Sequence, residues 1–180
     1  MMLRQEEETL YEFDVLAESE RDEMPRESLR ETGEGIRSAF EAPVMDVPRG
    51  PALTLSPETA IATAVETMRA RRRGAAIVLR NHRPVGVLTD REVLSRDGVL
   101  WGDLRSVPVG SVMSPCPEPL RAHDTVATAL KNMCARRQWH LPIVCGRGLF
   151  LGSLDVTDLS LWLGDSLTHV SVEAFFAGTS

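Results

Sequence analysis

The stretch Gly-Val-Leu-Thr-Asp-Arg-Glu at Gly86–Glu92 joins the end of an apolar strand directly to the start of a helix. A second copy of this pattern, Gly-Ser-Leu-Asp-Val-Thr-Asp, occurs at Gly152–Asp158. Each copy has a residue typical of a helix N-cap, Thr89 or Asp155, and an acidic residue three positions later. The backbone N–H groups of such a helix start are free to hold an anion. The two copies therefore predict two equivalent helix starts, each a candidate site.

The segments that precede these two stretches also match each other. Thr59–Met68 aligns with Asp124–Met133 at a constant shift of 65 residues. The two helix starts match at a shift of 66, and we place the extra residue before the second strand, so that Ile77-Val78 matches Ile143-Val144. The order of strand, helix, two strands and helix therefore occurs twice, which indicates a tandem repeat.

Hydrophobic periodicity gives the expected elements of each repeat. In the first helix, Ile61, Ala64, Val65 and Met68 recur at the spacing of one helix face. The first repeat is expected to contain a strand at 52–55, this helix up to about 73, strands at 75–79 and 85–88, and a helix at 90–95. The second is expected to contain an irregular strand at 117–120, a helix at 125–137, strands at 140–144 and 149–154, and a helix at 156–163. The pattern predicts an α/β (α+β) fold of two pseudo-symmetric β-α-β-β-α repeats.

Length and composition fit this organisation, because 180 residues with 43% hydrophobic content are enough to bury a core. We expect an acidic, largely flexible tail at 1–43, a first repeat at 44–98, a linker at 99–110, a second repeat at 111–164 and a C-terminal tail at 165–180. Val44-Met45 recurs as Val112-Met113 and is expected to open both repeats. A short helix could form at 27–40, and the pattern of the C-terminal tail does not decide between a strand and a helix.

Charge is concentrated at the N-terminus, where residues 1–43 hold 13 Asp and Glu against 5 Arg in a chain of net charge −6. The rest is close to neutral, which does not favour a nucleic-acid-binding surface. The tail is either a mobile segment or a docking peptide in which Tyr11, Phe13 and Leu16 anchor on a partner protein. No signal-peptide pattern and no membrane-spanning apolar run occur, so we expect a cytoplasmic protein that does not contact a membrane.

Motifs typical of catalytic or metal sites do not occur in the sequence. It contains no Gly-x-Ser-x-Gly, no phosphate-binding lysine loop and no His-Glu-x-x-His, and Lys131 is its one lysine. Three cysteines without close spacing do not indicate a disulfide framework or a paired-cysteine zinc site. We therefore expect no enzyme activity, no catalytic residue, no metal and no firmly bound cofactor.

The repeat resembles the cystathionine-β-synthase (CBS) domain, and two copies in tandem resemble the paired CBS module. His-Leu-Pro-Ile-Val at His140–Val144 and the stretch Gly86–Glu92 carry the resemblance, which covers about two thirds of the chain. It implies two domains packed sheet to sheet, with two clefts between them that commonly accept adenosyl ligands such as AMP, ATP, S-adenosylmethionine or NAD. It also implies that two modules associate into a flat homodimer.

The resemblance also implies which residues contact the ligand. The Thr or Ser after the third strand would hold phosphate and the Asp three residues later would hold ribose; these positions are Thr89 and Glu92 in the first repeat and Asp155 and Asp158 in the second. Backbone of the first two strands would line the base. The expected ligand-binding residues are Thr54, Ala76, Ile77, Val87, Thr89, Arg91, Glu92, Pro119, Trp139, His140, Leu141, Pro142, Asp155 and Asp158.

Neither copy keeps the full pair of residues. Glu92 stands where Asp is expected, and its extra methylene should weaken ribose binding by about 1 to 3 kcal/mol. Asp155 replaces the hydroxyl residue, and its charge about 5 Å from a phosphate costs roughly 3 kcal/mol at an effective dielectric constant near 20. Asp155 would disfavour an uncharged 5′ group or a cationic sulfonium less than it disfavours a phosphate. The cleft built on Thr89 is therefore our favoured site.

Two interpretations of these motifs stay open. The chain is a stand-alone regulatory module that senses an adenosyl ligand, as in energy sensing, and signals by a conformational shift; or it is a ligand-free dimeric scaffold that recruits a partner through its acidic tail. Thr89 and Asp155 are good helix caps with or without a ligand. Arg71–Arg73 and Arg136-Arg137 either stabilise helix ends from solvent or reach the clefts. Trp139 either stacks on adenine or packs in a core or interface.

Overall fold

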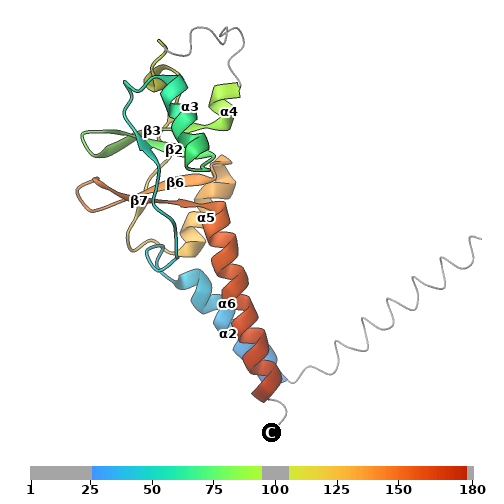
Figure 1. Cartoon of the computed structure of the whole chain (residues 1–180). Coiled ribbons are helices and arrows are strands. Elements are labelled where there is room, and N and C mark those ends of the chain that lie inside the picture. Colours follow the sequence, from blue (N-terminus) through green and yellow to red (C-terminus); the bar gives the residue numbers. More distant parts are fainter. Residues whose placement is uncertain (1–25, 95–105, 178–180) are drawn as a thin grey trace, which may run out of the picture. The chain divides into compact units, whose positions relative to one another are not determined.

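A computed structural model of the chain describes residues 26–94 and 106–177, with side chains from 33 to 94 and from 106 to 166 (Figure 1). Residues Phe40–Leu163, which contain both repeats, form one compact unit. Helix α2 (Arg26–Glu41) up to Ala39 and helix α6 (Val156–Ala177) from Gly164 belong to a second unit. No helix in the described ranges is long and apolar enough to cross a membrane.

The first repeat is a four-stranded sheet in the order β1-β2-β3-β4, with β1 parallel to β2 and the other neighbours antiparallel. Its strands are β1 (Thr54–Leu55), β2 (Ala75–Arg80), β3 (Arg83–Thr89) and β4 (Ser114–Pro115), and its helices are α3 (Ile61–Ala70) and α4 (Asp90–Leu94). The apolar face of α3 that the sequence predicts is the buried one. The core is formed by Leu53, Ile61, Ala64, Met68, Ala76, Val78, Leu88 and Val109.

The second repeat is a three-stranded sheet in the order β5-β6-β7, again with one parallel and one antiparallel pair. Its elements are β5 (Leu120–Arg121), α5 (Val126–Arg136), β6 (His140–Val144), β7 (Phe150–Asp155) and the first part of α6. Its core contains Val44, Val47, Leu120, Val126, Ala129, Met133, Leu141, Ile143, Leu154 and Leu159. The α/β fold of two β-α-β-β-α repeats is confirmed.

Each repeat receives a segment of chain that lies outside it in sequence. Val44 is fully buried in the second core, and its N–H donates to the carbonyl of Asp124 over 2.8 Å. At the equivalent position of the other repeat, Val109 is fully buried in the first core, and its N–H donates to the carbonyl of Thr59 over 2.7 Å. The structural counterpart of Val44 is therefore Val109, at a shift of 65 residues. It is not Val112, which the recurrence of the pair Val-Met in the sequence predicts. This exchange fastens the two repeats together.

The extra residue of the second repeat lies elsewhere than the sequence alignment places it. Ala76 pairs with Leu88, and Leu141 pairs with Leu154, so the shift of 65 holds through the second strand. The insertion is in the turn between β6 and β7, which contains Gly148 at φ +76°. The corresponding turn of the first hairpin, between β2 and β3, has two residues. Matching Ile-Val with Ile-Val was wrong because a slip of one residue turns every side chain of a strand to the opposite face.

Several bounds differ from those that the sequence predicts. Strand β4 was not anticipated, because a two-residue edge strand that ends in Pro115 gives no strand pattern. The predicted strand at 117–120 is limited to β5, and α6 continues well past the expected end at 163. Part of the expected acidic tail is helix α2, and Tyr11, Phe13 and Leu16 lie outside the described residues.

The two hairpins lie side by side on the same side of the unit (Figure 1). The N–H of Phe150 at the start of β7 donates to the carbonyl of His82, in the turn of the first hairpin, over 2.9 Å. Ile77 and Val87 are a cross-strand pair that is buried although it lies on the face opposite the helix-covered core. The two sheets therefore pack face to face, and we call the interface between them the seam.

Candidate functional site

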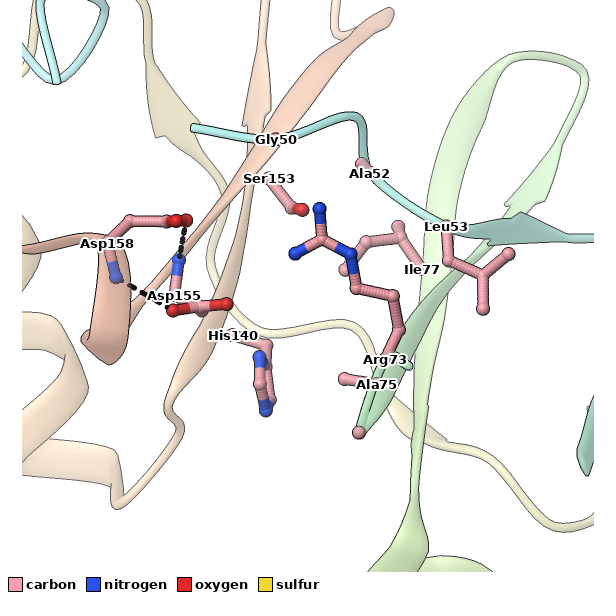
Figure 2. Close-up of a pocket in the computed structure, with 11 residues that line it drawn as sticks. Gly50, Ala52, Leu53, Arg73, Ala75, Ile77, His140, Ser153, Asp155 and Asp158 are labelled. Atoms are coloured by element: carbon pink, nitrogen blue, oxygen red, sulfur yellow. Dashed lines mark hydrogen bonds between the residues drawn. The ribbon is translucent and has the colours of Figure 1, made fainter. Parts of the chain in front are cut away.

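A pocket between the two repeats collects residues from both of them (Figure 2). It encloses about 410 Å³, counted together with the solvent at its mouth. The first repeat contributes the segment before β1, the residues before β2 and the start of β2, while the second contributes β6, β7 and the start of α6. The lining residues are Gly50, Ala52, Leu53, Arg73, Gly74, Ala75, Ile77, His140, Ser153, Asp155 and Asp158.

Apart from Arg73, the first-repeat wall of the pocket is formed by glycine, alanine and two larger apolar residues. The N–H of Ile77 donates to the carbonyl of Leu53 over 2.9 Å, which holds the two residues beside each other where β1 and β2 run parallel. Ala52 and Ala75 extend this wall with small side chains. A flat aromatic ring system can lie against such a surface, because aliphatic contact and the exclusion of water both favour it.

The second-repeat wall is acidic and is built on the first turn of α6. Asp155 Oδ1 accepts hydrogen bonds from the N–H groups of Thr157 at 2.8 Å and Asp158 at 2.9 Å. Asp158 Oδ2 in turn accepts the N–H of Asp155 at 3.2 Å, which completes a reciprocal capping box (Figure 2). Asp158 uses only Oδ2 in hydrogen bonds with the described residues, so its Oδ1 is available to a ligand.

A guanidinium group enters the pocket from the first repeat. Arg73 extends toward the second-repeat side (Figure 2), and its Nη2 donates to the carbonyl of Pro51 over 3.2 Å. A Cβ atom at Gly50 would lie 2.2 Å from this Nη2, so a side chain there would displace the guanidinium. Glycine at position 50 therefore allows Arg73 to occupy the pocket.

Burial shifts the pKa of two residues in the pocket. Burial raises the pKa of Asp158, and the neighbouring Asp155 carboxylate also raises it, while the hydrogen bond from the Asp155 N–H and the charges of Arg73 and Arg49 oppose the rise. Burial also lowers the pKa of His140, although four carboxyl groups act in the opposite direction. These four are Asp155, Asp158, Asp90 and Glu92. A neutral imidazole at the base of the acidic wall follows at neutral pH.

The helix start of the first repeat uses its acidic residue differently. Glu92 Oε2 accepts the N–H of Thr89 at 2.8 Å and also its hydroxyl, while Oε1 accepts the hydroxyl of Ser114 at 2.8 Å. Burial raises the pKa of Glu92, but these hydrogen bonds outweigh it and leave the pKa below its ordinary value. Both carboxylate oxygens are therefore engaged in holding α4 and β4 together.

The structure brings some of the predicted residues together and separates others. Ile77, His140, Asp155 and Asp158 line the pocket. Ala76 and Leu141 point into the helix-covered cores. The predicted residues that do not line this pocket are Thr54, Ala76, Val87, Thr89, Arg91, Glu92, Pro119, Trp139, Leu141 and Pro142. Their role in binding stays a prediction.

The pocket also contains residues that the sequence did not single out. Leu53 and Ser153 fall outside the expected set, although Ser153 is two positions before Asp155 on the same strand and so shares its face. Arg73 had two open interpretations, and the structure places it in the pocket and not in open solvent. Among the described residues, no group of three or more His, Cys, Asp or Glu is arranged to hold a metal ion.

Comparisons with known proteins identify the fold. Residues 44–98 match the family model described as "CBS domain". A search of curated proteins finds no match. A CBS-pair protein from Arabidopsis thaliana is 21% identical, with a TM-score of 0.58 over 67% of this chain and 92% of that chain.

Two further solved structures are similar to this chain and contain a nucleotide. The CBS domain of a bacterial CNNM/CorC family Mg²⁺ transporter in complex with ATP is 21% identical, with a TM-score of 0.64 over 77% of this chain and 97% of that chain. A CBS domain protein from Pyrobaculum aerophilum complexed with AMP is 19% identical, with a TM-score of 0.56 over 68% of this chain and 98% of that chain.

Proposed function

We propose that this protein, whose residues 44–98 are a CBS domain and whose two repeats have the fold of a CBS pair, is a regulatory module that binds an adenosyl ligand. The observation that carries the proposal is the pocket between the repeats, which combines an apolar wall, an available carboxylate oxygen and a guanidinium. Similar folds in complex with ATP and with AMP support the ligand class. The proposed role is regulatory and not catalytic.

Each part of an adenosyl ligand has a chemically suitable partner in this pocket. The adenine ring would lie against Leu53 and Ile77, which are 5% and 2% exposed, so the gain would come mainly from removing the apolar faces of the ring from water. The ribose hydroxyls would donate to Asp158 Oδ1, since hydrogen bonds to a carboxylate are stronger than those between neutral groups. The 5′ substituent would then lie near Asp155 and Arg73. Asp158, and not Glu92, is the acidic residue whose carboxylate is open to the ligand.

Signalling would follow from the position of the pocket across the seam. A ligand that contacts Ile77 on one side and Asp158 on the other stabilises the arrangement of the repeats in which both contacts are made. The exchanged segments at Val44 and Val109 would transmit a change in one repeat to the core of the other. The proposal includes a homodimer formed through the repeats, a protein partner that reads the shift, and a cytoplasmic location. Sedimentation analysis tests the homodimer, and cell fractionation tests the cytoplasmic location.

Isothermal titration with adenosine, AMP, ATP, NAD and S-adenosylmethionine tests the proposal. We expect at least one of them to bind, and Asp158→Ala to weaken that binding by about 10- to 100-fold, as for the loss of a hydrogen bond to a charged group. Thr89→Ala, at the other helix start, is the matched control and should leave the affinity unchanged. Loss of binding in Thr89→Ala with full binding in Asp158→Ala would move the ligand to the other cleft.

A ligand-free scaffold is the alternative, and one observation favours it. Asp155 and Asp158 complete a capping box, which gives both residues a structural role without any ligand. A folded dimer that releases no heat with any of the five compounds would support the scaffold. In that case a pull-down with the full chain, compared with a chain whose residues 1–25 are removed, would test recruitment through the acidic segment.

A further inference from the structure

The anion-binding position at the start of α6 is already filled by a side chain of the protein. Free N–H groups at a helix N-terminus attract anions such as phosphate. Here the N–H groups of Thr157 and Asp158 both donate to Asp155 Oδ1, at 2.8 and 2.9 Å. A phosphate could reach these donors only by displacing the carboxylate of Asp155, which would break both hydrogen bonds that cap α6.

The two arginines near the pocket each donate to main-chain carbonyls, which offsets the acidic wall only in part. Arg73 Nη2 donates to the carbonyl of Pro51 over 3.2 Å. Arg49 Nη1 donates to the carbonyls of Val44 and Val47 over 3.2 and 3.0 Å. His140 is neutral near pH 7, because burial lowers its pKa. The lining thus contains two carboxyl groups, those of Asp155 and Asp158, against the single guanidinium of Arg73.

From this arrangement we infer that Asp155 is a specificity-determining residue, and that the pocket selects adenosyl compounds whose 5′ carbon carries a neutral thioether or a cationic sulfonium instead of a phosphate. The inference rests on the proposed function, since it assigns the ligand class of the same pocket. A cationic 5′ group is attracted by the acidic wall that repels a phosphate. Asp155 therefore discriminates between ligands that share the same adenine and ribose.

The size of the effect follows from the charges. Two like unit charges about 5 Å apart at an effective dielectric constant near 20 lower an affinity by on the order of 100-fold. Salt reduces this value because the pocket is open to solvent on one side. We expect the protein to bind 5′-methylthioadenosine at least about 10-fold more tightly than AMP, with a gap that narrows as NaCl is raised.

The test is isothermal titration of the full chain with 5′-methylthioadenosine, S-adenosylmethionine, AMP and ATP, repeated with Asp155→Asn. Asparagine keeps a side-chain oxygen that can cap α6 and removes the charge alone. We expect Asp155→Asn to bind AMP about 10- to 100-fold more tightly than the unmodified chain, with little change for 5′-methylthioadenosine and weaker binding of S-adenosylmethionine. Ser160→Ala, in the second turn of the same helix, is the matched control and should change none of these affinities.

The outcomes separate this inference from the proposed function. Tighter binding of AMP than of 5′-methylthioadenosine by the unmodified chain, or an unchanged AMP affinity in Asp155→Asn, would overturn the inference and leave an adenosyl-binding module. No binding of any compound by a chain whose circular dichroism shows it folded would overturn both. A thermal melt of Asp155→Asn close to that of the unmodified chain shows that the comparison is made on folded protein.

Discussion

Glu92 joins the start of α4 to the edge strand β4, and this predicts an energetic coupling between Glu92 and Ser114. Glu92 Oε1 accepts the Ser114 hydroxyl at 2.8 Å, and Oε2 accepts the Thr89 N–H at 2.8 Å. A hydrogen bond to a charged acceptor contributes about 1.5 to 3 kcal/mol. Because the carboxylate is partly exposed, solvent reduces this value, and we expect a coupling of about 1 kcal/mol.

Urea denaturation of the unmodified chain, Glu92→Ala, Ser114→Ala and the double variant measures this coupling as a double-mutant cycle. We expect Glu92→Ala to lower the free energy of unfolding by about 2 kcal/mol, since it also removes the return hydrogen bond of the capping box. Glu66→Ala, at an exposed position of α3, is the matched control and should cost less than about 0.5 kcal/mol.

The coupling should also depend on pH in a defined direction. Burial raises the pKa of Glu92, but the hydrogen bonds from Thr89 and Ser114 leave it below the ordinary value of 4.5. The folded state therefore binds the proton less readily than the unfolded state, so this stabilisation is complete above the unfolded pKa. It is lost as the pH falls through the folded pKa. A coupling near zero at pH 7, or one that grows on acidification, would refute this reasoning.

Two further predictions concern the cores and the helix caps. Leu88→Ala and Leu154→Ala remove fully buried side chains at equivalent positions of the two cores, so each should lower the free energy of unfolding by about 2 to 5 kcal/mol; a cost below about 1 kcal/mol for either would contradict the equivalence. Thr125 caps α5 through the N–H of Thr128, whereas Ala60 at the start of α3 makes no side-chain cap bond. Thr125→Ala should therefore cost about 1 kcal/mol and Ala60→Ser should gain up to about that amount, and thermal melts showing the opposite signs would be inconsistent with these caps.

The repeated fold could be predicted from the sequence because each repeat carries its own local signals. Residues close together in the sequence determine the periodic face of α3 around Ile61, the apolar run Leu141–Val144 of β6, and the helix starts after β3 and β7. Strand β6 begins and ends where the sequence places it, at His140 and Val144. The sequence was therefore sufficient for those helices and strands whose position is determined by residues within the element itself.

The exchanged segments and the pocket could not be predicted in the same way. Nothing near Val44 indicates that it packs in the distant second core, because buried valine looks the same in either core. Aligning Ile77-Val78 with Ile143-Val144 placed the inserted residue before the second strand, whereas the strand pairing places it in the turn between β6 and β7. The sequence also did not determine that Ile77 and Asp158 would line the same pocket, since this depends on how two complete sheets pack.

A crystal structure of the protein with bound adenosine would show whether the pocket beside Asp158 is the ligand-binding site. Adenosine has no 5′ charge, so the outcome does not depend on the role of Asp155. The proposed function predicts that the adenine ring lies against Leu53 and Ile77, with a ribose hydroxyl within hydrogen-bond distance of Asp158 Oδ1. A nucleoside bound instead beside Thr89 and Glu92, or outside the seam between the repeats, would contradict it.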